Sequence, residues 1–342
     1  MQPEMSPAEA SATLMQLAGG LWISRVIWAA AHLRIADHID AEPVAIDALA
    51  TATGTSPDAL ARVLSALTSI GVFARAADGR ITHSPLSRVL RSDHPGTQRA
   101  FVESVFGHEH YEAWGAIAGT LRTGTTAFDL HYGKPVFDWF GEHPASAGLF
   151  AEAMTAVTRA TEEAVIAAHD FGRFGLAVDI GGSHGSLVRR LLAANPDARG
   201  ILFDLPATAA EGKAMWADAA EAPRLTAIGG DFFASVPAGG DLYLLKFILH
   251  DWTDQQSIAI LRNIRAAMKP DGTVAIIEMV LPDDPAIRHP GRFMDLNMLV
   301  MTGGRERSAN DYAALLEAAG LTLRSVTPTP SPMSVITAGI VE

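Results

Sequence analysis

The sequence predicts an α/β protein, in which a doubly wound parallel sheet follows a mostly helical N-terminal domain of the winged-helix type. Three observations carry this prediction. The chain has 342 residues, a length that suits two domains better than one. Residues 1–100 show short helical patterns, and strand and helix patterns alternate from Leu176 onward. We expect three parts: a winged-helix-like domain over 1–100, connecting helices over 101–170 and an α/β domain over 171–342.

Composition and charge exclude several classes of protein. Hydrophobic residues make up 49% of the chain and charged residues 19%, so disorder is not its main state. We expect no membrane span, because Arg25 and His32 interrupt the most apolar N-terminal stretch, and no secretory signal, because no basic region opens the chain. The absence of cysteine excludes disulfides, thiolate zinc sites and a cysteine nucleophile. A net charge of −12 disfavours a polyanionic partner. These features predict a cytoplasmic protein that acts on a small molecule.

The first helical segment is apolar on most of its circumference. Leu14, Leu17 and Leu21 fall near helical spacing, and Trp22 and Trp28 lie between further apolar residues. A helix of this kind must be buried against another surface. In a first segment, a second subunit often provides that surface.

A helix and a small hairpin follow. Ser56 and Pro57 suit the start of a helix that ends at Gly71, and residues 72–82 suit a hairpin around an Asp-Gly turn. Winged helices can bind DNA, but residues 1–100 hold eight arginines, no lysine and nine acids. That balance fits a phosphate backbone poorly, so we interpret the domain as structural.

The second half alternates strands with helices, as a doubly wound parallel sheet requires. Ligands bind such sheets at the carboxyl ends of the strands, so the residues that end each strand are the candidates for a site. The predicted strands cover 177–180, 200–204, 225–228, 241–246 and 273–279, and the predicted helices cover 186–194, 207–220 and 255–268.

A glycine-rich turn joins the first of these strands to its helix. It reads Asp179-Ile-Gly181-Gly182-Ser183-His184-Gly185, and glycines there let the backbone approach a ligand closely. Asp204 ends the second strand nineteen residues beyond Gly185, a spacing at which a carboxylate reaches both ribose hydroxyls. The turn lacks the GxGxxG order of dinucleotide sites and a Walker lysine. Its acid favours a cationic amino-acid group, as in S-adenosylmethionine, over a pyrophosphate.

A further acid follows the third strand. Asp231, in Gly230-Asp231-Phe232-Phe233, could accept a hydrogen bond from an adenine amine while Phe232 covers the ring. The alternative for Asp204 and Asp231 is an ordinary role as helix caps or solvated loop acids.

His250 is the candidate catalytic base. It follows an apolar strand that ends in Lys246 and precedes Asp251-Trp252, at the ligand-binding edge of the sheet. A neutral imidazole there could accept a proton from a phenol, whose pKa near 10 follows that of tyrosine. Glu278, at the end of the fifth strand, could hold the imidazole in one tautomer. Glu306 could reach the same place, or it could be an ordinary acid of a surface loop.

We expect no metal ion in the site. Hard divalent cations require clustered oxygen ligands, and the adjacent acids Asp283 and Asp284 are framed as a turn by two prolines. His108 and His110 are two residues apart, which does not place them on one helix face, and we interpret that segment as a loop.

These residues together resemble the plant-type, caffeate and flavonoid class of S-adenosylmethionine-dependent small-molecule O-methyltransferases, including their bacterial relatives. The resemblance covers nearly the whole chain. Its most specific motif is Leu245-Lys246 through His250-Asp251-Trp252, and Arg305-Glu306-Arg307-Ser308 is similar to the late Glu-Arg-Thr motif of the family. The glycine turn departs from the family pattern at Ser183 and His184, which puts cofactor affinity in doubt.

The resemblance implies a Rossmann-like fold, a homodimer through the N-terminal helices and an aromatic small-molecule acceptor. S-adenosylmethionine would be the methyl donor and S-adenosylhomocysteine the product. It implies three groups of residues. The catalytic residues are His250, Glu278 and Glu306; the cofactor contacts are Asp179, Gly181, Gly182, Ser183, Asp204, Leu205, Gly230, Asp231, Phe232 and Lys246; and the substrate contacts are Met154, Asp251, Met294, Asn297, Met298 and Met301. Methionines at helical spacing are also typical of a core.

Other functions remain open at this point. A relative that binds the same cofactor but catalyses hydroxylation or decarboxylation would have the same cofactor residues. A winged-helix regulator with a ligand-sensing domain is disfavoured by the charge of its first hundred residues, and a nicotinamide dehydrogenase is disfavoured by the order of the glycines.

Overall fold

We describe residues 5–340 of the protein from a computed structural model. The chain forms two compact units. The first extends to Tyr111 and includes Pro144–Ala156, and the second comprises Glu112–His143 and the chain from Val157 onward. The long helix α11 (Pro144–Ala168) contributes to both units. The three-part division expected from the sequence stays a prediction.

The first unit contains the helix, helix and hairpin pattern that the sequence predicts. A core of leucine, isoleucine and alanine side chains holds these elements together, with Ile35, Leu49, Leu64 and Ile81 fully buried. Pro57 opens its helix, as expected, but Ser56 makes no side-chain cap bond to it. The elements are α1 (Pro7–Ala18), α2 (Gly20–His32), α3 (Ile46–Thr53), α4 (Pro57–Ser69), β1 (Phe73–Arg75), β2 (Ile81–His83), α5 (Pro85–Arg88) and α6 (Arg99–Val105).

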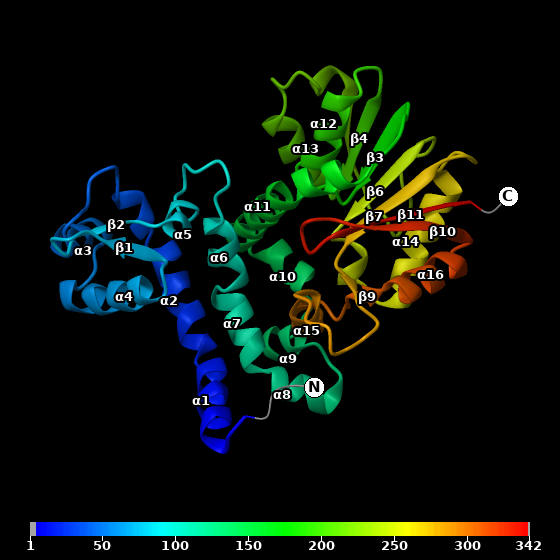
Figure 1. The fold of residues 1–342 in the computed structure, drawn as a ribbon. Helices are drawn as coiled ribbons and strands as arrows, with labels where there is room; N and C mark the ends of the chain where they lie inside the picture. The colour runs from blue at the N-terminus through cyan, green and yellow to red at the C-terminus, as the bar shows by residue number, and fades with distance from the viewer. Residues whose placement is uncertain (1–4, 341–342) are drawn as a thin grey trace. The chain divides into compact units, whose positions relative to one another are not determined.

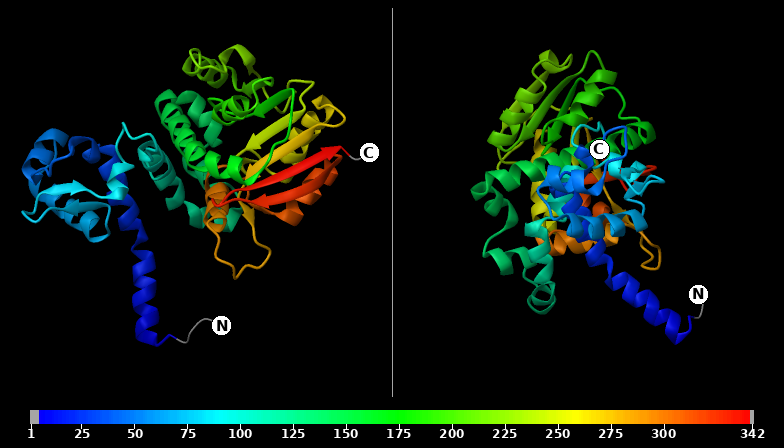
Figure 2. Two further views of the ribbon diagram at one scale, coloured as in Figure 1. Left: turned by 45° about the horizontal axis from the view of Figure 1, so that its top comes forward. Right: turned by 90° about the vertical axis from the view of Figure 1, so that its left-hand side faces the viewer.

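Helices α1 and α2 expose apolar side chains. Figure 2 shows α1 continuing the direction of α2, and no residue of α1 is buried. By length and composition alone, the helical stretch Pro7–His32 could cross a membrane, so the expectation of no membrane span stays a prediction. One such helix is weak evidence of a span, since core helices and signal sequences also pass. Leu14, Met15, Leu17 and Trp22 are each more than two-thirds exposed.

The second unit is built on a mixed sheet that has seven strands within the described residues, in the order β10-β11-β7-β6-β3-β4-β5 (Figure 1). The five strands from β7 to β5 are parallel, and chain order reverses between the neighbours β6 and β3. Ligands bind doubly wound sheets at that point. The parallel strands are β3 (Leu176–Ile180), β4 (Arg199–Asp204), β5 (Leu225–Gly229), β6 (Leu242–Lys246) and β7 (Thr273–Glu278).

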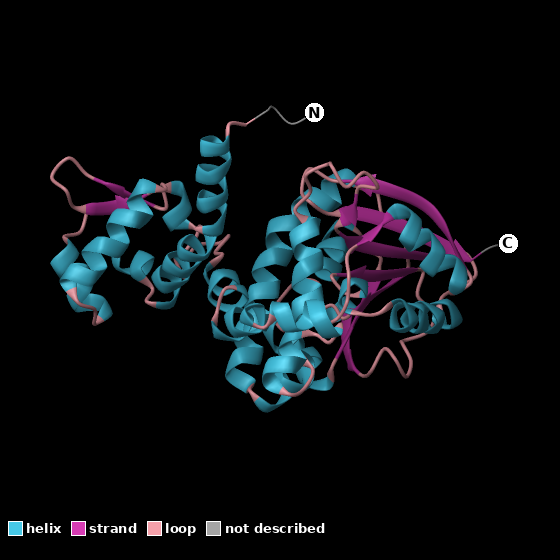
Figure 3. Cartoon of the chain, turned by 90° about the horizontal axis from the view of Figure 1, so that it is seen from below, coloured by secondary structure: helices cyan, strands magenta, loops and turns pink. Residues whose placement is uncertain are grey.

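Helices cover both faces of this sheet (Figure 3). Apolar residues of α14 and α16 pack on one face, and those of α12 and the end of α11 pack on the other. The main helices of the unit are α12 (Ser186–Ala194), α13 (Pro206–Met215), α14 (Asp254–Ala267), α15 (Gly291–Met301) and α16 (Ala309–Ala318). The smaller ones are α8 (Ile117–Thr123), α9 (Ala127–Tyr132) and α10 (Val136–Glu142), and α7 (His108–Gly115) ends in this unit.

Three predicted features differ from the structure. The sheet is not wholly parallel, because β10 (Leu321–Pro328) and β11 (Ser334–Ile340) add an antiparallel edge next to β7. The segment around His108 and His110 is the start of α7, not a loop. His110 is buried there, and burial lowers its pKa to about 4. Helix α13 ends at Met215, five residues before the predicted end.

Candidate active site

The glycine turn lies so close to neighbouring residues that a side chain in place of Gly181 or Gly182 would collide with them. A Cβ on Gly181 would lie 2.4 Å from Ile248 Cδ1, and one on Gly182 would lie 2.5 Å from the carboxyl carbon of Asp179. Gly181 has a φ of 65°, which glycine adopts without strain. Ser183, where the turn departs from the pattern of the family that it resembles, has a φ of 52°. The backbone N–H of Ser183 donates a hydrogen bond to the carboxylate of Asp204.

Two carboxylates lie at the ends of the neighbouring strands β3 and β4. Asp204 accepts hydrogen bonds from the N–H groups of Ser183 at 2.8 Å and Leu205 at 2.7 Å, and burial raises its pKa. Asp179 is buried, and burial raises its pKa to about 7. Its Oδ2 atom has no hydrogen-bond partner in the described part of the chain. Both acids therefore flank the glycine turn.

The residues that follow β5 adjoin the same turn. Gly230 donates its N–H to the carbonyl of Asp204 at 2.9 Å. The ring of Phe232 lies 3.9 Å from the position that a Cβ on Gly181 would occupy. Asp231 is exposed and accepts the N–H of Phe233 at 2.8 Å. That hydrogen bond is the turn contact of an ordinary loop acid. It uses one of the two carboxylate oxygens of Asp231.

Lys246 ends β6, beside the end of β3. Its Nζ donates to Thr158 Oγ1 at 2.8 Å. Burial lowers its pKa to about 8, against the opposing effect of nearby carboxylates. The next residue, Phe247, has a φ of 54°, a strained value for a bulky side chain that is typical of functional sites.

His250 forms a buried cluster with two glutamates. Its Nδ1 atom lies 2.8 Å from Glu306 Oε1 and 3.8 Å from Glu278 Oε2. Glu278 Oε1 accepts the N–H groups of Ile248 and Leu249, each at 3.0 Å, which fixes both the carboxylate and the turn before His250. On the other side of the ring, Nε2 lies 3.8 Å from Asp251 Oδ1.

The carboxylates strengthen His250 as a base. Burial alone would lower the pKa of His250, but Glu278, Asp251 and Glu306 outweigh burial and raise the pKa to about 10. Burial in turn raises the pKa of Glu278 to about 7 and that of Asp251 to about 6. The raised pKa makes His250 a stronger base than free imidazole, which is the direction that proton transfer from a phenol requires.

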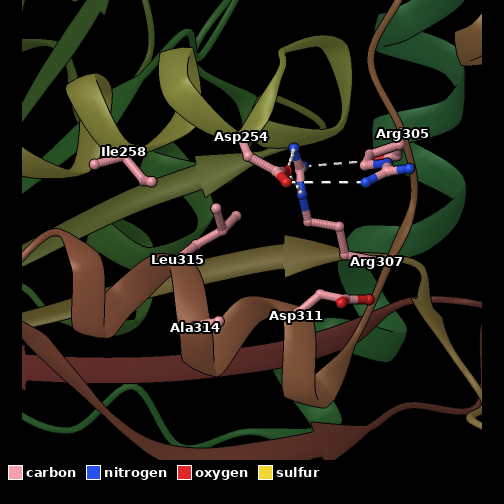
Figure 4. Close-up of a pocket in the computed structure, with 7 residues that line it drawn as sticks. All are labelled: Asp254, Ile258, Arg305, Arg307, Asp311, Ala314 and Leu315. Carbon is pink, nitrogen blue, oxygen red and sulfur yellow. Dashed lines mark hydrogen bonds and ion pairs between the residues drawn. The ribbon is translucent and has the colours of Figure 1, made fainter.

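Arg307 ties the His250 turn to the segment that carries Glu306. Its guanidinium donates to the carbonyls of Leu249 and Trp252, each at 2.8 Å, and pairs with Asp254 (Figure 4). Arg307 is 1% exposed. The backbones also touch, because a Cβ on Gly304 would lie 2.0 Å from the carbonyl oxygen of His250. The pocket in Figure 4 surrounds this ion pair and contains none of the predicted cofactor or substrate contacts.

The predicted substrate residues are less closely grouped. Met298 and Met301 are buried in α15, and Met294 is half-buried. Asn297 accepts the indole N–H of Trp114 at 3.1 Å. Met154 belongs to the first compact unit and the four residues of α15 to the second.

Sequence reasoning missed two parts of this region. It assigned no role to Arg307, although the residue lies within a quoted motif. It also missed Glu162, an acid of α11 that is 1% exposed and accepts the hydroxyl of Ser186 at 3.0 Å. A carboxylate four residues after Thr158, in a largely apolar helix, is the signal that could have identified it.

His250, Glu278 and Glu306 also meet a distance test for a metal site. One ligand atom from each lies within 4.8 Å of the others. However, the imidazole nitrogen of this set is hydrogen-bonded to Glu306, and one oxygen of Glu278 is occupied by two backbone N–H groups. In this structure, hydrogen bonds hold the histidine and both acids in place.

Comparison with known proteins decides the family. Residues 114–322 match the O-methyltransferase domain, and residues 15–93 match the O-methyltransferase dimerisation domain. The chain belongs to the O-methyltransferase family. It is an S-adenosylmethionine-dependent O-methyltransferase, as the resemblance predicted, and the predicted fold class is confirmed as a mostly parallel sheet with an N-terminal helical dimerisation domain.

Three proteins illustrate what this O-methyltransferase is similar to. It is 40% identical over 330 residues, 96% of each chain, to phenazine O-methyltransferase PhzM of Lysobacter antibioticus. The crystal structure of NcsB1, from neocarzinostatin biosynthesis, contains S-adenosylmethionine and 2-hydroxy-5-methyl naphthoic acid. It matches with a TM-score of 0.80 and 31% identity over 93% of this chain and 96% of that one. Aclacinomycin 10-hydroxylase RdmB of Streptomyces purpurascens is 31% identical over 91% of this chain and 84% of its own length.

Proposed function

We propose that this O-methyltransferase methylates a phenolic hydroxyl of a small aromatic molecule, with His250 as the general base and no metal ion. The observation that carries the proposal is the hydrogen bond between His250 Nδ1 and Glu306. It leaves Nε2 as the nitrogen that can accept a proton, at the carboxyl end of β6 where ligands bind this class of sheet.

The residues around the glycine turn fit S-adenosylmethionine. A Cβ on Gly181 or Gly182 would collide with Ile248 or Asp179, and a turn without these side chains also lets a ligand approach the backbone closely. Asp204 is the proposed ribose contact and Leu205 adjoins it, while Gly230, Asp231 and Phe232 would hold the adenine. Asp179, Ser183 and Lys246 are proposed contacts of the methionine part. When bound, S-adenosylmethionine supplies a methyl group that its sulfonium already activates.

The protein then has two tasks, to orient the acceptor and to remove its proton. His250 accepts the phenolic proton at Nε2, and its Nδ1–H remains bonded to Glu306. The negative charges of Glu306 and Glu278 stabilise the resulting imidazolium, as the acid of a catalytic triad does. Asp251, Met294, Asn297, Met298 and Met301 are proposed acceptor contacts, with Met154 as a further one.

The aromatic character of the acceptor is inferred from the relatives and from the base. PhzM is named for a phenazine, and NcsB1 was crystallised with a naphthoic acid. A phenol is acidic enough to transfer its proton to His250, whereas an aliphatic alcohol is a much weaker acid.

A labelled-methyl assay tests this function. The protein is incubated with methyl-labelled S-adenosylmethionine and a panel of phenols, hydroxyphenazines and hydroxynaphthoates, with and without a chelator, and products are identified by mass spectrometry. We expect the label on an aromatic oxygen and the same rate after chelation. No labelled product would contradict the methyl transfer, and activity lost on chelation and restored by a divalent cation would contradict the metal-free mechanism.

The pH dependence of kcat/KM tests the electrostatics of the base. Because carboxylates raise the pKa of His250 to about 10, the unprotonated base becomes more abundant with rising pH, and kcat/KM should increase from pH 7 towards pH 9. Glu278→Gln removes one negative charge, so it should shift this rise to lower pH. An unshifted profile in Glu278→Gln would contradict the proposed electrostatic role of Glu278.

We also propose that the chain is a homodimer through α1 and α2. These helices expose Leu17 and Trp22, each more than 70%, and a partner subunit would remove this apolar surface from water. Light scattering should give about twice the chain mass of 36.2 kDa, and the double substitution Leu17→Glu and Trp22→Glu should give a monomer. Ile70→Glu, on another exposed apolar residue, is the matched control and should stay dimeric. A monomeric wild type would contradict the proposal.

Hydroxylation is the second candidate function, because the relative RdmB is named a hydroxylase. The two functions differ in product. A product that gains oxygen and no label would favour hydroxylation.

A further inference from the structure

The carboxylate of Glu162 is only half satisfied. The residue is 1% exposed, and its Oε2 atom accepts the hydroxyl of Ser186 at 3.0 Å. Its Oε1 atom is buried and has no hydrogen-bond partner among the described residues. A buried carboxylate oxygen without a donor is unfavourable, so a ligand that brings a donor would bind there with a gain in stability.

Glu162 lies between the glycine turn and Lys246. Ser186 is the first residue of α12 and directly follows Gly185, the last residue of the turn. On the other side, Thr158 is four residues before Glu162 on α11, which places both residues on one face of the helix. The hydroxyl of Thr158 accepts a hydrogen bond from the ammonium of Lys246. The carboxylate of Glu162 therefore lies between the glycine turn that follows β3 and Lys246 at the end of β6.

Charges of both signs surround Glu162. Glu162, Asp179 and Glu278 interact electrostatically with Lys246, and Arg190 and Arg159 also act on Glu162. Burial raises the pKa of Glu162, which means that a further cation in contact with its buried oxygen would favour its charged form. This charge pattern is complementary to a ligand that carries both an ammonium and a carboxylate.

We propose that Glu162 binds the α-amino group of the methionine part of the cofactor through Oε1. Lys246 would offer its ammonium to the α-carboxylate of the same ligand. The bond to Ser186 gives Glu162 a structural role as well, but that role uses only one carboxylate oxygen. This inference rests on the proposed function, since it names a contact within the proposed cofactor site.

A double-difference binding experiment tests the contact. Isothermal titration calorimetry gives the affinity of wild type and Glu162→Gln for S-adenosylhomocysteine and for its analogue in which hydrogen replaces the α-amino group. In the wild type, the amino group should improve affinity roughly tenfold to a hundredfold, as for a hydrogen bond between charged groups. In Glu162→Gln this preference should largely disappear, while affinity for the analogue changes little. Glu163→Gln, at the exposed neighbouring acid, is the control and should keep the wild-type preference.

Two results would overturn the inference. One is an amino-group preference that persists in Glu162→Gln, which would mean that another group binds the amine. The other is an equal loss of affinity for both ligands, which is what a purely structural role predicts. If Glu162→Gln does not fold, Glu162→Asp withdraws the carboxylate while keeping its charge and should reduce the same preference. A wild type that binds neither ligand would instead contradict the proposed cofactor site.

Discussion

Replacing His250 by alanine should lower kcat on the order of 10²–10⁴-fold, the usual loss when a general base is removed. The imidazole is the proposed proton acceptor, and its removal would leave Glu306 and Glu278 buried without the cation that they stabilise. Affinity for S-adenosylhomocysteine should change little, because the proposed cofactor contacts lie on the glycine turn and at the ends of β4, β5 and β6. Steady-state kinetics and calorimetry on the same preparation measure both quantities.

The comparison of rate and binding makes this substitution informative. If His250→Ala lost cofactor binding and rate together, His250 would be part of the cofactor site or needed for folding. An unimpaired rate would remove His250 from the mechanism, and the protein would act by positioning the acceptor alone.

Replacing Arg307 by methionine should destabilise the protein by about 2–5 kcal/mol, because the buried carbonyl of Leu249 and the partly buried carbonyl of Trp252 would lose their charged donor. The guanidinium is 1% exposed, so water cannot replace it without opening the turn. Denaturant unfolding measures the loss, and kcat should fall as well, since the turn that Arg307 holds carries His250.

Arg305 provides the matched control for Arg307. Its side chain is 63% exposed and lies 3.8 Å from the same Asp254 carboxylate. Arg305→Met should therefore change the free energy of unfolding by less than about 0.5 kcal/mol, as for most surface positions. Equal effects of the two substitutions would show that the burial and carbonyl contacts of Arg307 do not stabilise the turn.

The parallel part of the fold could be predicted because its signals are local. Strands β3 to β7 are short apolar runs between turn residues, and helical patterns follow β3, β4 and β6. Strands β10 and β11 were not predicted. Their antiparallel pairing next to β7 depends on contacts with a strand more than fifty residues earlier, which no local pattern indicates.

The site could be predicted to the level of strand ends, but not to the level of contacts. Asp204 was identified because it ends a buried strand, and His250 because it follows one. The loop that carries Glu306 reaches His250 through contacts of Gly304, Arg305 and Arg307, and these contacts are tertiary. Glu162 was missed for the same reason, since burial of a single acid in a helix is decided by the elements packed around it.

Rates with a series of phenols of graded acidity test the central claim that His250 removes the acceptor's proton. The measurement is the ratio of kcat for wild type to kcat for His250→Ala, with phenols that range from weakly acidic to fully ionised at the assay pH. A proton acceptor is needed only while the phenol is protonated. The ratio should therefore be large for weakly acidic phenols and fall towards one for ionised phenols. A ratio that stays constant across the series would contradict general-base catalysis by His250.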